Sequence, residues 1–300
     1  MNPRSESQMR LAGLLSELAP QEGMQATQIE GVQVYRQSHS APRGPMVYRP
    51  HIIVVGQGRK RAFVGDEVYT YDPFNYLVLA VPLPAECEAE AAPEKPILMV
   101  NIDVEASMVA ELILEMEDSA PAPDEAPRAI STTPMSPELG DAVIRLLECL
   151  KSPVDSRLLG RQIVREVIYR VLRGDRGGAL RALANRDDRF TRISRALKYI
   201  HAEYARPIGV DDLAKQAGMS LSVFHHHFKL VTATSPLQYL KQIRLDAAKM
   251  LMIQDGYNAA TAAHAVGYES ASQFSREFKR LFGRTPVEEV EAARERLAAR

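Results

Sequence analysis

Two hydrophobic periods divide this chain. From about residue 30 to 104, short apolar runs alternate with turn residues, which is the pattern of strands in a small β-barrel or jelly roll. The runs cover residues 31–35, 52–58, 61–66, 76–81 and 97–102. Elsewhere apolar residues recur every three to four positions, as on one face of a helix. The pattern predicts an α+β protein, with an N-terminal barrel accompanied by helices and an all-α C-terminal part.

Helical periodicity outside the barrel begins with a short amphipathic stretch at residues 8–19. After a loop rich in Pro, Ala and acidic residues at 118–137, two apolar stripes follow, at 139–150 and 158–172. Both stripes suit packing on the barrel or pairing with a second copy of the chain, and the sequence leaves these two open. Gly174 and the Gly177-Gly178 pair then predict a hinge.

The last third repeats one pattern of a short helix, a glycine and a second helix. Gly218 corresponds to Gly267, 49 positions later, and Phe228 to Phe278, 50 positions later. We expect each glycine to end its helix in the left-handed conformation, and Ser220 to cap the next helix through its hydroxyl. Two such units in tandem are typical of a protein with two helix-turn-helix DNA readers.

Each second helix has an apolar face and a polar face. Phe224 and Phe228 lie four apart on one face, and Phe274 and Phe278 repeat that spacing. The opposite face supplies short or hydrogen-bonding side chains suited to base edges and phosphates. These candidate DNA contacts are Ser222, His225, His226 and Lys229 in the first unit and Ala271, Ser272, Gln273, Arg276 and Lys279 in the second.

The triple histidine His225-His226-His227 could be a metal site, a set of DNA contacts or a group of solvent-facing side chains. Consecutive helical side chains point about 100° apart, so three cannot converge on one ion. We expect His225 and His226 to contact DNA; the alternative is that they face solvent and touch phosphates only weakly. We expect His227 to pack against the preceding helix.

A long helix is predicted between the two units. Pro236 suits a first helical position, helical periodicity continues to about Met252, and Asp255-Gly256 breaks it. Seventeen residues span about 25 Å at 1.5 Å each. With the width of the flanking units, the two second helices would lie roughly 34 Å apart, about one turn of DNA.

Charge separates the two halves of the chain. The whole carries 37 Lys and Arg against 38 Asp and Glu. Residues 185–300 contain 18 basic and 13 acidic residues, a net charge of +5, and residues 1–184 have a net charge of −6. A basic part joined to an acidic one suits a DNA reader with a separate regulatory half, although a net charge of +5 also suits an ordinary solvated surface.

Residues 188–290 resemble the AraC/XylS family of bacterial transcription regulators. The resemblance rests on DDLA at 211–214, AGMS at 217–220, SPLQYL at 235–240, VGYES at 266–270 and FSREFK at 274–279, with Gly283 and Pro286. Ala233 stands where members usually have glycine, and His226 where many have arginine. The resemblance implies promoter DNA and RNA polymerase as partners, a homodimer formed through helices after the barrel, and activation more than repression.

A second resemblance covers residues 50–96. QGRK at 57–60, GDEVY at 65–69 and YDP at 71–73 are similar to the cupin-like N-terminal domain of one AraC subgroup. The expected organisation is a cupin-like effector domain at 1–136, a helical dimerisation and hinge segment at 137–178, and a double helix-turn-helix domain at 185–300. A small-molecule effector would bind in the barrel and control promoter binding.

The alternative function is a small-molecule-binding or enzymatic cupin with a helical interaction module. A metal cupin needs converging His and carboxylate ligands, whereas residues 1–184 contain only His39 and His51. We therefore expect no enzyme activity, no metal and no cofactor. Salt-sensitive DNA binding would favour the regulator over this alternative.

Cys87 is the candidate sensing residue of the barrel. Related regulators include some thought to answer reactive aldehydes, so this thiol is a candidate electrophile sensor. Glu86 and Glu88 flank it, and their negative charges disfavour a thiolate and slow its attack. The alternative is a structural cysteine. Cys149 lies on an apolar helical face, where we expect it to be packed.

The localisation expected from the sequence is the bacterial cytoplasm, with association to the nucleoid when DNA is bound. No run of 18 apolar residues is present, so no transmembrane helix is expected. The N-terminus lacks a basic stretch followed by an apolar one, as a secretory signal would require. Two cysteines do not make a disulfide framework.

Overall fold

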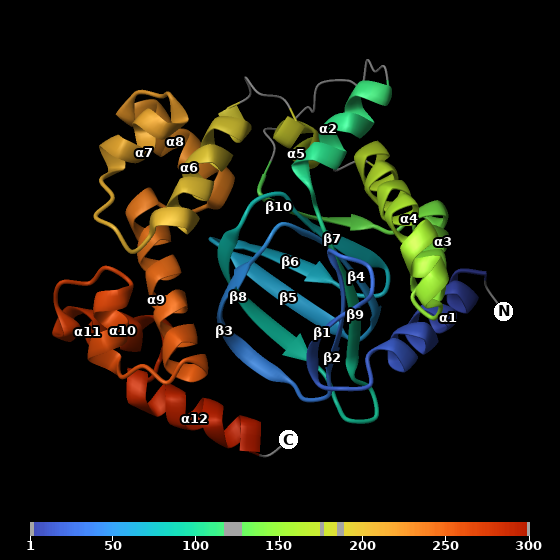
Figure 1. Ribbon diagram of the computed structural model, residues 1–300, viewed down its shortest axis with the longest axis horizontal. Helices are drawn as coiled ribbons and strands as arrows, with labels where there is room; N and C mark the ends of the chain where they lie inside the picture. The colour runs from blue at the N-terminus through green and yellow to red at the C-terminus, as the bar shows by residue number, and fades with distance from the viewer. Residues whose placement is uncertain (1–2, 117–127, 175–176, 185–188, 299–300) are drawn as a thin grey trace. The chain divides into compact units, whose positions relative to one another are not determined.

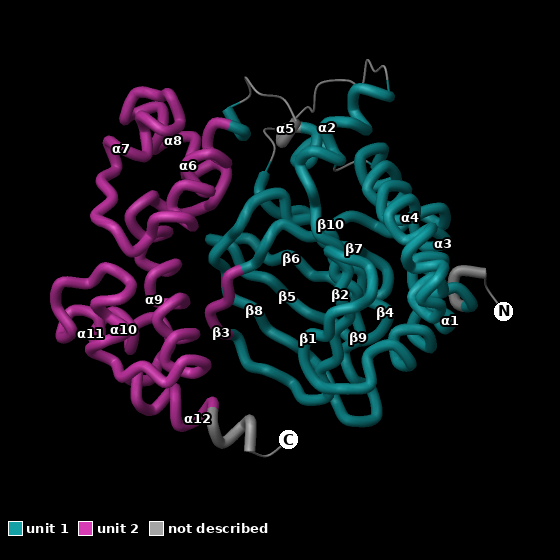
Figure 2. Tube along the Cα trace, viewed as in Figure 1, with its two compact units in different colours: residues 1–43, 48–191 teal, residues 44–47, 192–300 magenta. Residues whose placement is uncertain are grey.

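A computed structural model describes residues 3–116, 128–174, 177–184 and 189–298. The chain forms two compact units, one of residues 1–43 and 48–191 and the other of residues 44–47 and 192–300 (Figure 2). The first unit contains the strands, apart from the strand residues 44–47, and the second is mainly helical (Figure 1). This confirms the predicted α+β class.

The strands of the first unit form two antiparallel sheets. The six-stranded sheet has the order β1-β2-β9-β4-β7-β10, and the four-stranded sheet has the order β3-β8-β5-β6. Their bounds are β1 Gly23–Ala26, β2 Val32–Gln37, β3 Ala41–Tyr48, β4 His51–Gln57, β5 Arg59–Val64, β6 Glu67–Tyr71, β7 Asn75–Leu79, β8 Leu83–Glu90, β9 Ile97–Asp103 and β10 Ile130–Pro134. Within the described residues the sheets do not close into one barrel, and a cupin-like β-sandwich describes them best.

All five strands expected from the apolar runs are present, but the other five lie in segments that the sequence did not mark as strands. One of them, β10, falls inside the region at 118–137 that was predicted to be a loop. It pairs along β7, from Ile130 opposite Leu79 to Pro134 opposite Asn75. Residues 117–127 of that predicted loop lie outside the described part of the chain.

Helices cover the outer face of the six-stranded sheet (Figure 1). Helix α1 (Pro3–Leu18) contacts β2, β4 and β9. Gly56 of β4 allows this approach, because a Cβ there would lie 2.6 Å from Leu15 Cδ1 and 3.3 Å from Ala12 Cα. Helix α3 (Pro137–Cys149) packs between α1 and α4 (Pro153–Arg173), so both predicted stripes form helices.

The predicted hinge is partly occupied by structure. Gly174 ends α4, and Gly178 begins α5 (Gly178–Ala184), which packs on α2 (Ala106–Glu115) in the first unit. Gly177 has no room for a side chain, because a Cβ would lie 2.4 Å from the Leu172 carbonyl oxygen. The first compact unit therefore continues past these glycines, to residue 191.

The helical unit contains two similar halves joined by one long helix. Its helices are α6 Arg189–Glu203, α7 Val210–Ala217, α8 Leu221–Thr232, α9 Pro236–Gln254, α10 Ala259–Ala265, α11 Ala271–Phe282 and α12 Pro286–Ala298. Helix α9 begins at the predicted proline and runs two residues past Met252. Figure 1 shows α7 and α8 near one end of α9 and α10 and α11 near the other.

Candidate DNA interface

Aromatic stacks hold each second helix against its neighbours. Phe224 and Phe228 of α8 are fully buried, and the Phe228 ring meets the Tyr239 ring of α9 at 5.5 Å between centroids. Phe274 and Phe278 of α11 are also fully buried, with ring centroids 5.5 Å apart, and the Phe274 ring meets the Tyr268 ring at 5.4 Å. The buried faces predicted from the four-residue spacing are confirmed.

Helix ends match the expectation at the glycines and differ at one serine. Gly218 ends α7 with a left-handed φ of 59°, as predicted. Ser220 occupies the cap position of α8, but its side chain makes no capping hydrogen bond, so that expectation was wrong. In α11 the equivalent Ser270 does accept a hydrogen bond, from the Gln273 backbone nitrogen at 3.3 Å. Helix α8 thus begins without the side-chain cap that α11 has.

The candidate DNA-contacting side chains lie on the surfaces opposite the phenylalanines. In α8, Ser222, His225, His226 and Lys229 are all exposed. In α11, Ser272, Gln273, Arg276 and Lys279 are exposed, and Ala271 is half-buried at the first helical position. Each helix therefore presents a row of polar side chains to solvent, and on α8 the apolar Leu221, Val223 and Leu230 are exposed as well.

The three histidines of α8 do not converge. The His225 ring lies beside the Phe224 ring, with centroids 6.4 Å apart, and the His226 and His227 rings meet edge to face at 5.1 Å. His227 is half-buried, whereas its two neighbours are exposed. Over the described residues, no group of three or more His, Cys, Asp or Glu side chains is placed to hold a metal ion.

Glu277 is a residue of this interface that the sequence reasoning missed. Its carboxylate accepts hydrogen bonds from Lys241 Nζ at 2.8 Å, Tyr268 OH at 2.9 Å and Gln273 Nε2 at 3.3 Å. Burial raises the pKa of Glu277, but these three donors outweigh it and leave the pKa below its usual range. The charged carboxylate joins α11 to α9 and orients the amide of one candidate DNA contact.

Cys87 lies inside the β-sandwich and not on its surface. It is 6% exposed, and its sulfur lies 3.7 Å from the Tyr71 hydroxyl. Strand alternation in β8 turns Glu86 and Glu88 to the other face, where Arg43 and Arg61 pair with them. The two carboxylates and the thiol therefore lie on opposite faces of β8. The prediction that these carboxylates slow attack by the thiol assumed that they lie close to it, which they do not. Cys149 is buried, as expected.

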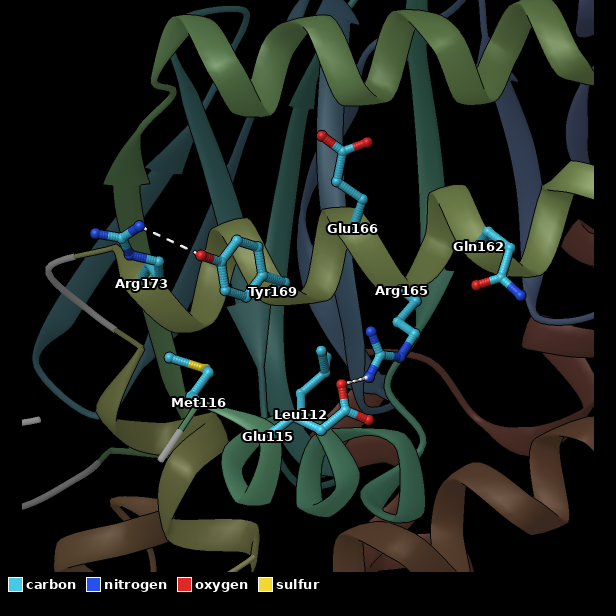
Figure 3. A pocket seen from close by; sticks show the side chains of 8 residues that line it. All are labelled: Leu112, Glu115, Met116, Gln162, Arg165, Glu166, Tyr169 and Arg173. Atoms are coloured by element: carbon cyan, nitrogen blue, oxygen red, sulfur yellow. Dashed lines mark hydrogen bonds and ion pairs between the residues drawn. The ribbon is translucent and has the colours of Figure 1, made fainter. Parts of the chain in front are cut away.

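An open groove of about 560 Å³ lies between α2 and α4 (Figure 3). Its charged groups are already engaged, since Arg165 pairs with Glu115 at 2.5 Å and Arg173 donates to Tyr169 OH at 3.3 Å. Glu166 pairs with Arg145 at 2.6 Å. This balance gives the groove no evident preference for a charged ligand.

The fold and the paired helix-turn-helix units define a two-domain transcription regulator. Residues 28–179 match the family described as AraC-type transcriptional regulator N-terminus, and residues 213–291 match a helix-turn-helix domain. The chain belongs to the AraC-type transcriptional regulators. Of the described residues, no helix has the length and apolar character needed to cross a membrane.

Similar proteins include the HTH-type transcriptional regulator AlkR of Acinetobacter baylyi, which is 40% identical over 94 residues, 31% of each chain. The raffinose operon transcriptional regulatory protein RafR of Pediococcus pentosaceus is 28% identical over 142 residues, 47% of this chain and 50% of that protein. These matches thus span from about a third to half of the relatives' length.

One solved structure extends the similarity of fold over both domains. Fatty-acid-bound ToxT of Vibrio cholerae has a TM-score of 0.59, with 86% of this chain and 94% of that chain covered. At 12% identity this similarity concerns the fold alone.

Proposed function

We propose that this protein is a sequence-specific DNA-binding transcription regulator that reads two successive major grooves with α8 and α11. The observation that carries the proposal is the pair of polar helix surfaces at the two ends of one helix. The 19 residues of α9 span about 28 Å. With the width of the flanking units, that length suits readers about one DNA turn, roughly 34 Å, apart.

Within each reader, different side chains carry different parts of recognition. Arg276 and Gln273 have the donors and acceptors that discriminate base edges, whereas Lys229 and Lys279 suit phosphates. His225 and His226 lie on the equivalent surface of α8 and are proposed as further contacts. Ser222, Ala271 and Ser272 are short enough to let the backbone approach the duplex closely.

The first unit is proposed to control the second by binding a small effector, with activation at promoters where RNA polymerase binds. The N-terminal match to the AraC-type family supports this division of labour, and ToxT, with a similar fold, binds an unsaturated fatty acid. The effector would shift the population of conformations that engage DNA. The proposed place of action is the bacterial cytoplasm, on the DNA of the nucleoid. Cys87 remains a candidate sensor only for electrophiles that reach the sandwich interior.

A homodimer formed through α4 is part of the proposal. Val154, Leu158 and Leu159 at the start of this helix are 51%, 65% and 51% exposed. Three large apolar side chains exposed within six residues favour a contact with a second copy. Dimerisation would place two double readers on a promoter.

Footprinting of the full chain on DNA upstream of its own and neighbouring genes, across a salt series, tests the function. We expect protected segments about one helical turn apart and steep loss of protection as salt rises, because phosphate contacts release counterions. The double variant Gln273→Ala and Arg276→Ala should lose the site, whereas Arg49→Ala, an exposed residue of the other unit, should not. Salt-insensitive behaviour would favour the cupin alternative.

A further inference from the structure

The interior of the β-sandwich contains a lysine that has no part in the proposed DNA interface. Lys60 of β5 is 5% exposed, and its Nζ lies 5.0 Å from the centre of the Tyr35 ring. Tyr35 belongs to β2 of the opposite sheet, so the lysine points across the sandwich. Over the described residues, no hydrogen bond or ion pair joins this Nζ to another group; the Tyr35 ring faces it, and Cys87 is a further electrostatic neighbour.

Hydroxyl and thiol groups line the same interior face. Lys60 is paired in register with Tyr71, and the neighbouring Ala62 with Cys87. The Tyr71 hydroxyl lies 2.9 Å from the Tyr48 hydroxyl and 3.7 Å from the Cys87 sulfur. Burial raises the pKa of both tyrosines, so both remain protonated and able to donate. The four-stranded sheet thus presents an amine and two phenols inward.

Asn101 adds an acceptor from the six-stranded sheet. It is 5% exposed, its Nδ2 donates to Met24 Sδ at 3.5 Å, and its Oδ1 is buried without a partner among the described residues. Tyr35 pairs with Met99, so Asn101 lies diagonally beside Tyr35, roughly 7–8 Å away. Tyr35 therefore has Lys60 and Asn101 as neighbours.

A mostly buried amine and a buried carbonyl oxygen that lack hydrogen-bond partners are both costly, because each has given up its hydrogen bonds to water. A single molecule satisfies both when it carries an acceptor at one end and a donor at the other. Burial lowers the pKa of Lys60, and a nearby anion would favour its charged form. Met24 is 47% exposed, so this side of the group borders solvent.

We propose that Lys60, Tyr48, Tyr71 and Asn101 form a binding site for a small hydroxycarboxylate. The carboxylate accepts from the Lys60 amine and a tyrosine hydroxyl, and the ligand hydroxyl donates to Asn101 Oδ1. This assignment rests on the proposed effector role of the first unit and names the ligand class and the residues. Because the ligand needs both groups, a simple alkyl acid or alcohol binds more weakly.

The test is the thermal midpoint of the full chain, and the heat of binding, with 3-hydroxybutyrate, butyrate and 1-butanol. We expect 3-hydroxybutyrate to raise the midpoint by several degrees and to bind at least tenfold more tightly than butyrate or butanol. Lys60→Met should abolish binding, and Asn101→Leu should reduce 3-hydroxybutyrate to the level of butyrate. The matched control Arg59→Met, whose arginine is exposed on the same strand, should bind normally.

Three outcomes overturn the site: no shift with any probe, equal shifts with butyrate, or an unchanged shift in Lys60→Met. Footprinting of ligand-free Lys60→Met separates this failure from that of the proposed function. If the DNA is protected but none of the three probes binds, only the hydroxycarboxylate site is rejected. If the wild-type protein protects no DNA at any salt concentration, the proposed DNA binding is rejected.

Discussion

At the residue scale, Ala233 is the most unusual backbone position of the described chain. It follows α8 with a φ of 57°, and no other described residue apart from glycines has a positive φ. The equivalent position after α11 is Gly283, with a φ of 75°. The sequence marked Ala233 as a departure from the family, and the structure confirms that this position requires the left-handed conformation.

We expect Ala233→Gly to stabilise the protein by about 0.5–1 kcal/mol. Relief of left-handed strain contributes roughly 1–2 kcal/mol, and the added freedom of the unfolded chain removes about 0.4–1 kcal/mol. Urea denaturation measures the difference. The reciprocal Gly283→Ala should destabilise by a similar amount, because a Cβ there meets no atom within 4 Å and only the backbone changes. Two substitutions of the same sign would refute the argument.

Arg276→Ala should weaken binding to the specific site by about 1–3 kcal/mol and remove the preference at one base pair. The reason is that an arginine at this exposed position of α11 can make a bidentate contact with a guanine edge. Competition binding with single-base variants of the footprinted site measures both effects. Equal weakening on every sequence would mean that Arg276 contacts only phosphate.

At the element scale, the contacts that Glu277 makes between α11 and α9 give the protein a pH-dependent stability. Its pKa is depressed in the folded state, so its contribution to stability is present above the pKa of the unfolded chain and is lost as pH falls through the folded value. We expect Glu277→Gln to lower stability at pH 7 and to reduce the difference in stability between pH 7 and pH 4. Glu269→Gln, an exposed neighbour, should leave both unchanged.

Helix α9 makes a different prediction, about DNA spacing. Because one rigid helix joins the readers, inserting either 5 or 10 base pairs between the two protected segments should weaken binding at least tenfold. A flexible linker would instead tolerate 10 added pairs, which restore the face of the duplex. Gel-shift titrations of the two lengthened sites distinguish these cases.

The strands and helices that the sequence predicted correctly are those in which the apolar positions of the sequence are the buried positions of the structure. Strand β4 is apolar over its length because α1 and the sandwich interior cover both faces, so it was predicted. Strand β8 was missed because Glu86, Glu88 and Glu90 alternate with small residues, although this alternation places Cys87 inside. Sequence also gave no sign of Lys60 as an interior residue, because its burial depends on pairing with strands distant in the chain.

At the scale of the whole molecule, the exposed apolar residues of α4 predict a dimer. Leu158→Glu should convert the protein to a monomer in sedimentation at micromolar concentration, because it places a charge in the proposed contact. Leu114→Glu is the matched control, since this leucine is 79% exposed on α2. A dimer that survives Leu158→Glu would place the contact elsewhere or reject it.

In the proposed DNA complex, the long helix α9 would also determine how strongly two individually weak readers hold DNA. Once one reader is bound, the other is held near its groove at an effective concentration on the order of millimolar. The affinity of the pair can therefore exceed that of either reader by roughly 10²–10⁴ without any new contact. If one reader were damaged, the other would still let the protein find its promoters, but the protein would dissociate from them quickly. The damage would therefore shorten the time for which each promoter is occupied more than it would change which promoters are recognised.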